Sequence, residues 1–70
     1  MSKFQVYYAY DEGDWIKDGQ LFDSVELCHK HIEKLRPEIM RILNKGECLE
    51  FSITDSNNLD DVFTSKEQRQ

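Results

Sequence analysis

A long amphipathic pattern occupies the middle of the chain, between Asp23 and Gly46. Its apolar residues recur at alternating steps of three and four, which is the spacing that places side chains on one face of an α-helix. These residues are Val25, Cys28, Ile32, Leu35, Ile39 and Ile42. The pattern predicts one long helix with one buried face.

Residue types at the ends of this pattern predict where the helix begins and ends. Asp23 is expected to be the N-cap, and Glu26 would complete a capping box with it. Gly46 is expected to end the helix because glycine readily adopts the left-handed conformation of a C-terminal cap. Pro37 removes a backbone hydrogen bond within the helix. We therefore expect either a bend there or a break into two shorter helices.

Residues 3–10 and 48–54 alternate apolar and polar side chains and are rich in aromatic and β-branched types, which predicts two half-buried strands. Shorter strands are expected near 15–17 and 62–65, with a turn at residues 18–19. The predicted fold is α+β, with a small antiparallel sheet of three to four strands and the long helix packed on one face.

We expect one domain over residues 1–65 and a flexible C-terminal tail over 66–70. The predicted core combines the apolar face of the helix with the apolar positions of the two main strands. It consists of Phe4, Val6, Tyr8, Val25, Cys28, Ile32, Leu35, Ile39, Ile42, Leu49, Phe51 and Ile53.

Size and composition argue against an enzyme. A chain of 70 residues buries only about 60 % of the surface that its unfolded form exposes, which leaves little room for a deep cavity. The sequence contains no nucleophile elbow, phosphate loop or dinucleotide fingerprint. We therefore predict no catalytic residues and no cofactor. No apolar run is long enough to span a bilayer, so no membrane association is expected.

The cysteines and histidines do not form a metal-binding motif. Cys28, His29, His31 and Cys48 could in principle supply four zinc ligands. However, Cys28 lies in the apolar face of the helix, and residues 29 and 31 should point to opposite sides of it. We predict no metal site. Two cysteines are too few for a disulfide framework, and no signal peptide is apparent, which favours the cytoplasm.

Acidic residues cluster in the predicted turns of a chain whose net charge is −5. If these turns lie at one edge of the sheet, they form a negative patch around a tryptophan, and such a patch suits a basic protein partner. The alternative is ordinary turn chemistry, since aspartate is common in turns. The candidate partner-binding residues are Asp11, Glu12, Asp14, Trp15, Asp18, Asp55, Asp60 and Asp61.

The preferred functional hypothesis is a small, acidic, non-enzymatic protein-interaction module. Size and charge resemble those of viral or mobile-element inhibitors, and a negative surface could imitate nucleic acid to occupy a basic groove. A homodimer is also compatible with the sequence.

The runner-up hypothesis is a nucleic-acid-binding accessory protein. Lys30, Lys34, Arg41 and Lys45 share one side of the predicted helix, opposite the apolar face, and could contact phosphates. The simpler interpretation is a solvated helix surface. We favour the latter because a net charge of −5 repels nucleic acid at long range.

Overall fold

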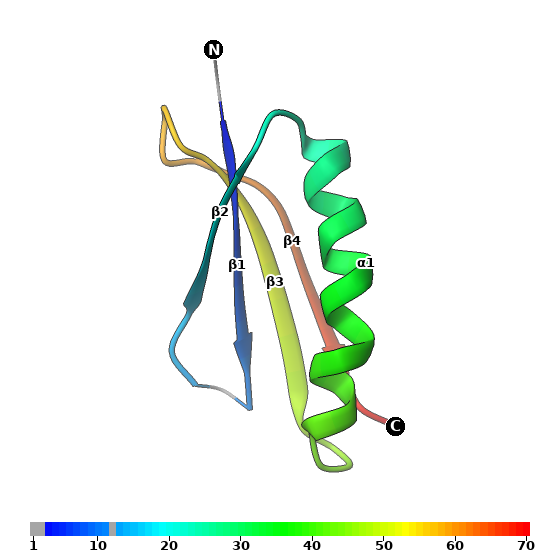
Figure 1. Ribbon diagram of the computed structural model, residues 1–70. Helices are drawn as coiled ribbons and strands as arrows, with labels where there is room; N and C mark the ends of the chain where they lie inside the picture. Colours follow the sequence, from blue (N-terminus) through cyan, green and yellow to red (C-terminus); the bar gives the residue numbers. More distant parts are fainter. Residues whose placement is uncertain (1–2, 12) are drawn as a thin grey trace.

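The computed structural model describes residues 3–11 and 13–70 and confirms the α+β fold. Four antiparallel strands form one sheet in the order β2-β1-β3-β4, and a single helix packs on one face (Figure 1). The elements, in chain order, are β1 (Phe4–Tyr10), β2 (Ile16–Phe22), α1 (Val25–Ile42), β3 (Cys48–Asp55) and β4 (Asp61–Gln68). Strands β2 and β3 run in the same direction on either side of β1, and α1 connects them.

The core lies between α1 and the sheet, as the periodicity predicts. Buried side chains come from β1, α1 and β3, and partly buried ones, including Phe4, Tyr8, Val25 and Leu35, pack around them. One predicted core residue is wrong. Ile42 is 69 % exposed, whereas Leu43 is only 5 % exposed. The cause is that α1 ends at Ile42 and Leu43 has an extended backbone, with ψ of 147°, which interrupts the helical spacing.

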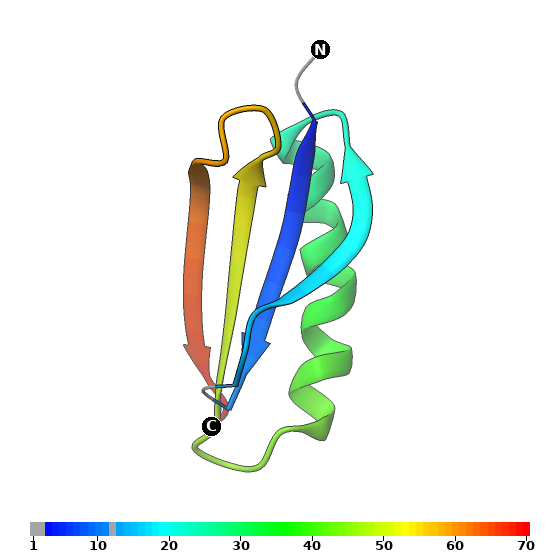
Figure 2. The same cartoon turned by 90° about the vertical axis from the view of Figure 1, so that its left-hand side faces the viewer.

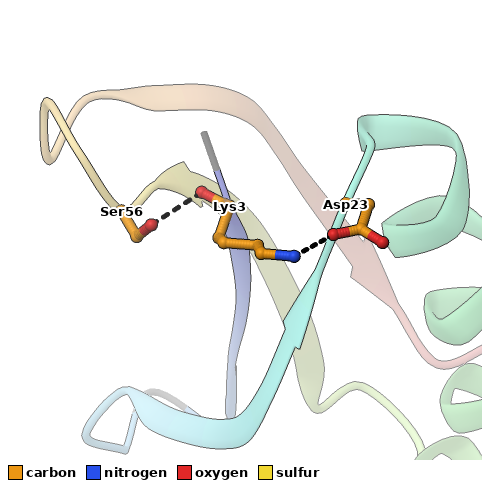
Figure 3. Close-up of polar contacts among 3 residues, drawn as sticks. All are labelled: Lys3, Asp23 and Ser56. Atoms are coloured by element: carbon orange, nitrogen blue, oxygen red, sulfur yellow. Dashed lines mark hydrogen bonds and ion pairs between the residues drawn. The ribbon is translucent and has the colours of Figure 1, made fainter. Parts of the chain in front are cut away.

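The helix begins one residue later than expected. Ser24, not Asp23, is the N-cap, and its hydroxyl accepts a hydrogen bond from the backbone N–H of Leu27 at 3.2 Å. Because Leu27 rather than Glu26 occupies the third helical position, no capping box forms. Asp23 instead pairs with Lys3, whose carbonyl also accepts a hydrogen bond from the Ser56 hydroxyl at 2.8 Å (Figure 3).

Pro37 does not break the helix, since α1 is continuous over 18 residues. Both Pro37 and Glu33, the residue whose carbonyl loses its hydrogen-bond donor, are exposed, so solvent can satisfy that carbonyl. Gly46 does not cap α1, which has already ended. It has a φ of +92° in the turn before β3, and its N–H donates to the carbonyl of Arg69 at 2.9 Å.

The turn predicted at residues 18–19 is wrong, because both residues lie inside β2. Gly19 has a φ of +84°, and the pairing with β1 shifts between Gln5, opposite Leu21, and Tyr7, opposite Lys17. The left-handed glycine therefore produces a bulge rather than a reversal of the chain. The strand is accordingly longer than the short one expected near 15–17.

The C-terminal tail predicted at 66–70 is also wrong over most of its length. Strand β4 runs to Gln68 and pairs with β3 down to the Cys48–Gln68 pair. The Arg69 guanidinium donates hydrogen bonds to the carbonyls of three residues at the C-terminal end of α1, namely Met40, Arg41 and Leu43. The Met40 carbonyl also accepts a hydrogen bond from the backbone N–H of Leu43 at 3.3 Å, and Arg69 adds a donor to the carbonyls at this end of the helix.

Candidate functional site

One face of the sheet is not covered by the helix. Helix α1 lies behind the strands in Figure 2, and on the opposite side the segment that leads into β2 passes in front of β1. Antiparallel sheets tolerate this arrangement because alternate side chains point to opposite faces. The residues that alternate with the core positions, such as Tyr7, Ser52 and Thr64, therefore form this face, which we call the open face.

The open face contains a shallow hollow of about 410 Å³. Aromatic, aliphatic and hydroxyl side chains surround a single carboxylate there. The lining residues are Tyr7, Trp15, Ser52, Thr54, Leu59, Asp61 and Thr64. Trp15 is 51 % exposed and Leu59 is 78 % exposed. Large apolar side chains that remain this exposed beside a concave surface are typical of contact sites.

Asp61 is held in a defined orientation within the hollow. Its Oδ1 atom accepts hydrogen bonds from the hydroxyls of Ser52 at 3.2 Å and Thr54 at 3.1 Å. Ser52 is only 6 % exposed, so one of the two donors is fixed by its burial. The other carboxylate oxygen, Oδ2, has no hydrogen bond to any residue that the structure describes. The carboxylate is thus oriented on one side and available on the other.

A β-bulge explains why Asp61 reaches the open face. Ile53 lies opposite Phe63 on the helix side, but Thr54 lies opposite Asp61 rather than Val62. Without this shift Asp61 would pair with Asp55, which shares the helix-facing side of β3 with Ile53. The extra residue in β4 therefore turns the Asp61 carboxylate from the helix side to the open face.

The candidate partner-binding residues do not form one acidic patch. Antiparallel strands place the β1–β2 loop, with Asp11 and Asp14, at one end of the sheet, and the end of β3 and the β3–β4 loop, with Asp55 and Asp60, at the other (Figure 2). The condition for an acidic patch, that these loops share one edge of the sheet, is therefore not met. Of the predicted residues, the hollow brings together Trp15 and Asp61. Glu12 lies outside the described residues.

Asp11 contributes to the end of the sheet rather than to the hollow. Its backbone N–H donates to the carbonyl of Cys48 at 2.9 Å, and its side chain shares a hydrogen bond with Glu47. A hydrogen bond from the backbone N–H of Asn44, followed by the one with Asp11, holds the pKa of Glu47 below its usual range. The interaction between Asp11 and Glu47 therefore belongs to the turns at this end of the sheet.

Asp18 lies on the helix side of the sheet and contacts His31. The Oδ2 atom of Asp18 is 2.8 Å from Nε2 of His31, and both atoms are buried. The Phe22 ring stacks against His31 with centroids 5.0 Å apart. Each atom is the other's close polar neighbour, and neither has a hydrogen-bond partner among the described residues. This interaction fixes the bulged part of β2 to α1 and removes Asp18 from any exposed acidic surface.

The two histidines of α1 point to opposite edges of the sheet, as their spacing predicts. His31 lies against Phe22 of β2. His29 lies against Phe63 of β4, with the ring centroids 4.4 Å apart. Cys28 is fully buried, and burial raises the pKa of its thiol, which keeps it protonated and unreactive. No group of three or more potential metal ligands occurs among residues 3–11 and 13–70.

The cationic residues of the second hypothesis remain exposed but do not all lie on the helix. Lys30, Lys34 and Arg41 are on the outer side of α1, whereas Lys45 is in the turn that follows it. Arg36, between them in sequence, pairs with Glu67. The line of charges is therefore shorter than the sequence predicts.

The chemistry of the open face was partly predictable. The alternation of residues 48–54 already assigns Ser52 and Thr54 to the side away from the core. The contributions of Tyr7, Leu59 and Thr64 were missed, because the hollow depends on strand order and on the β4 bulge. No periodic signal in the sequence marks either of these.

No protein-family model, curated protein or solved structure matches this chain. The one helix of the described chain is not apolar enough to cross a membrane.

Proposed function

We propose that this protein is a non-enzymatic protein-binding module that uses the open face of its sheet. The observation that carries the proposal is the hollow in which the exposed Trp15 and Leu59 lie beside the oriented carboxylate of Asp61. Tryptophan is among the residues that contribute most to protein–protein binding. Trp15, which has an apolar ring system and one polar N–H group, is therefore available for contact at this hollow.

The shape of the hollow supports a protein partner better than a reaction. It is open to solvent, and its single carboxylate lies on an exposed residue. Catalytic and ligand sites are usually clefts or cavities that bury most of the bound molecule. The face instead presents a broad, mixed apolar and polar surface of the kind found in transient interfaces.

The charge of the chain favours a partner with a basic surface. The net charge is −5, and the loops at both ends of the sheet are acidic. Opposite charges accelerate association and exclude partners of the same sign. We infer an inhibitor or modulator that covers a basic groove, including one that normally holds nucleic acid. The two free cysteines, Cys28 and Cys48, support action in a reducing compartment such as the cytoplasm.

The proposal is tested by capturing partners on immobilised protein and measuring them by quantitative mass spectrometry. The informative variant is Trp15→Ala, which removes the exposed aromatic side chain without disturbing a strand. The matched control is the double variant Lys30→Ala and Lys34→Ala, which alters the outer side of α1 instead. We expect specific partners to be lost with Trp15→Ala and retained with the control.

The opposite pattern would reject the open face as the binding surface. Partners that survive Trp15→Ala but disappear with the lysine variant would assign binding to α1. If those partners were nucleic acids, and their binding fell steeply with salt, the second hypothesis of a nucleic-acid-binding accessory protein would replace the first.

A further inference from the structure

We propose that the hollow on the open face binds an arginine side chain of the partner. The guanidinium would stack on Trp15 and donate hydrogen bonds to Asp61. This inference rests on the proposed function and specifies the chemistry by which a basic partner is recognised. It follows from three features of the hollow: its carboxylate, its aromatic side chains and its openness.

The carboxylate is prepared to accept hydrogen bonds from a cation. The hydroxyls of Ser52 and Thr54 both donate to Oδ1 of Asp61, which restrains the carboxylate before a ligand arrives. Oδ2 has no donor among residues 3–11 and 13–70. Prepositioned groups lose less conformational entropy on binding, and hydrogen bonds between charged partners are stronger than those between neutral ones.

The aromatic side chains favour a planar cation. Trp15 and Tyr7 line the same hollow as Asp61, and Trp15 is 51 % exposed, so part of its ring surface is available. Guanidinium stacks on aromatic rings and forms hydrogen bonds in its own plane, whereas the ammonium group of lysine has no plane to stack. An aromatic side chain beside a fixed carboxylate therefore discriminates arginine from lysine.

The dimensions of the hollow suit a side chain that projects from a larger partner. Its volume of about 410 Å³ is at the lower end of small-ligand sites, but it is not enclosed. A free small molecule would remain largely in water there. An arginine anchored to a protein can use the hollow while its neighbours contact the surrounding face, including Leu59, which is 78 % exposed at the edge.

Charges of both signs surround the hollow, and the carboxylate within it remains unpaired among the described residues. Asp60 adjoins Asp61 in sequence and is exposed. Two lysines share the open face: Lys17 of β2 lies opposite Tyr7 and is exposed, and Lys66 of β4 lies opposite Glu50 in the neighbouring strand, where its charge is offset. The Asp61 carboxylate is therefore not neutralised by an ion pair with any residue that the structure describes.

The test uses three synthetic nine-residue peptides that alternate glycine with arginine, lysine or citrulline. Citrulline has the shape of arginine without its charge. Binding is measured by two-dimensional NMR of the isotope-labelled protein, together with the fluorescence of its single tryptophan. We expect the arginine peptide to shift the resonances of Tyr7, Trp15 and Thr64. The lysine peptide should bind several-fold more weakly, and citrulline should not bind measurably.

Two variants separate a specific site from general attraction to a negative protein. Asp61→Asn preserves the shape of the side chain and removes its charge, and should weaken the arginine peptide about tenfold or more. Glu38→Gln removes one charge from the exposed side of α1 and should change affinity by less than about twofold, since exposed charges act weakly at a distance. The unliganded spectrum of each variant shows whether it is folded.

Equal weakening by Asp61→Asn and Glu38→Gln would overturn the proposal, as would equal affinity for the arginine and lysine peptides. Either result leaves the broader function intact if Trp15→Ala still abolishes capture of protein partners. Conversely, retention of partners by Trp15→Ala would reject the open face as the partner-binding surface, whatever the peptides do.

Discussion

Leu59 adopts a backbone conformation that is unusual for its residue type. It has a φ of +60°, and its N–H donates to the carbonyl of Asp55 at 2.7 Å, which closes the β3–β4 loop. The left-handed conformation costs a residue with a side chain roughly 1–2 kcal/mol, and glycine or asparagine normally occupies it. A leucine that is also 78 % exposed gains little from burial in this chain. Binding to a partner would account for its presence.

Leu59→Gly should separate stability from binding. Glycine relieves the strained backbone but gains freedom in the unfolded chain, so the free energy of unfolding should stay constant or rise by up to about 1 kcal/mol. Capture of partners should fall at the same time, because the apolar edge of the hollow is lost. Chemical denaturation and the capture experiment measure the two effects. Reduced stability, or undiminished capture, would contradict this account of Leu59.

At the scale of secondary structure, the periodicity of apolar residues predicts which elements form. It does not predict the residues at which they begin and end. The helix and the two central strands follow from the spacing of their apolar residues, which the core requires. The boundaries depend on which neighbouring side chain forms a given hydrogen bond. Asp23 and Ser24 are both good N-caps, and the attraction of Asp23 to Lys3 leaves the cap to Ser24. That contact joins segments distant in sequence, so local pattern could not predict it.

The sequence pattern also does not predict the bulges in β2 and β4. The bulge in β4 places Asp61 in the candidate site. Asp18-Gly19 is a common turn signal, yet β2 continues through it and Asp18 contacts His31 of α1. The bulge in β4 decides whether Asp61 faces the helix or the hollow. In both cases the outcome depends on pairing with a neighbouring strand, which a single segment does not encode.

The assignment of the N-cap can be tested by comparing two alanine variants. Ser24→Ala should lower the free energy of unfolding by about 1 kcal/mol, because the N–H of Leu27 loses its acceptor. Asp23→Ala removes an exposed ion pair and should cost less than about 0.5 kcal/mol. Urea denaturation of both variants provides the measurement. A larger loss for Asp23→Ala would restore Asp23 as the cap.

For the whole molecule, the limited core makes connections between elements important. The structure is elongated, measuring 40 × 20 × 17 Å, and helix and sheet enclose one thin apolar layer. A domain of this size is only marginally stabilised by burial. Polar contacts that join elements far apart in sequence therefore matter more than they would in a larger protein. The exposed Lys3–Asp23 pair is a weak connection of this kind, and the buried Asp18–His31 contact is a second.

Arg69 provides a third connection, at the end of the molecule where the sequence predicts a flexible tail. Its guanidinium satisfies the carbonyls of Met40, Arg41 and Leu43, while its backbone pairs with Gly46 and Glu47 at 2.9 Å. It therefore holds together the end of α1, the start of β3 and the end of β4. A positive charge at this position also complements the helix dipole.

Arg69→Ala should consequently lower the free energy of unfolding by about 1.5–3 kcal/mol, the range for hydrogen bonds to a charged group. Arg41→Ala is the matched control, since it removes the same charged group from the last turn of α1, where Arg41 is exposed. Its cost should be less than about 1 kcal/mol. Hydrogen exchange should show the loss of protection concentrated in the last turn of α1. If Arg69→Ala and Arg41→Ala unfold at the same denaturant concentration, residue 69 behaves as the tail that the sequence suggests, and the three elements are held together by apolar packing alone.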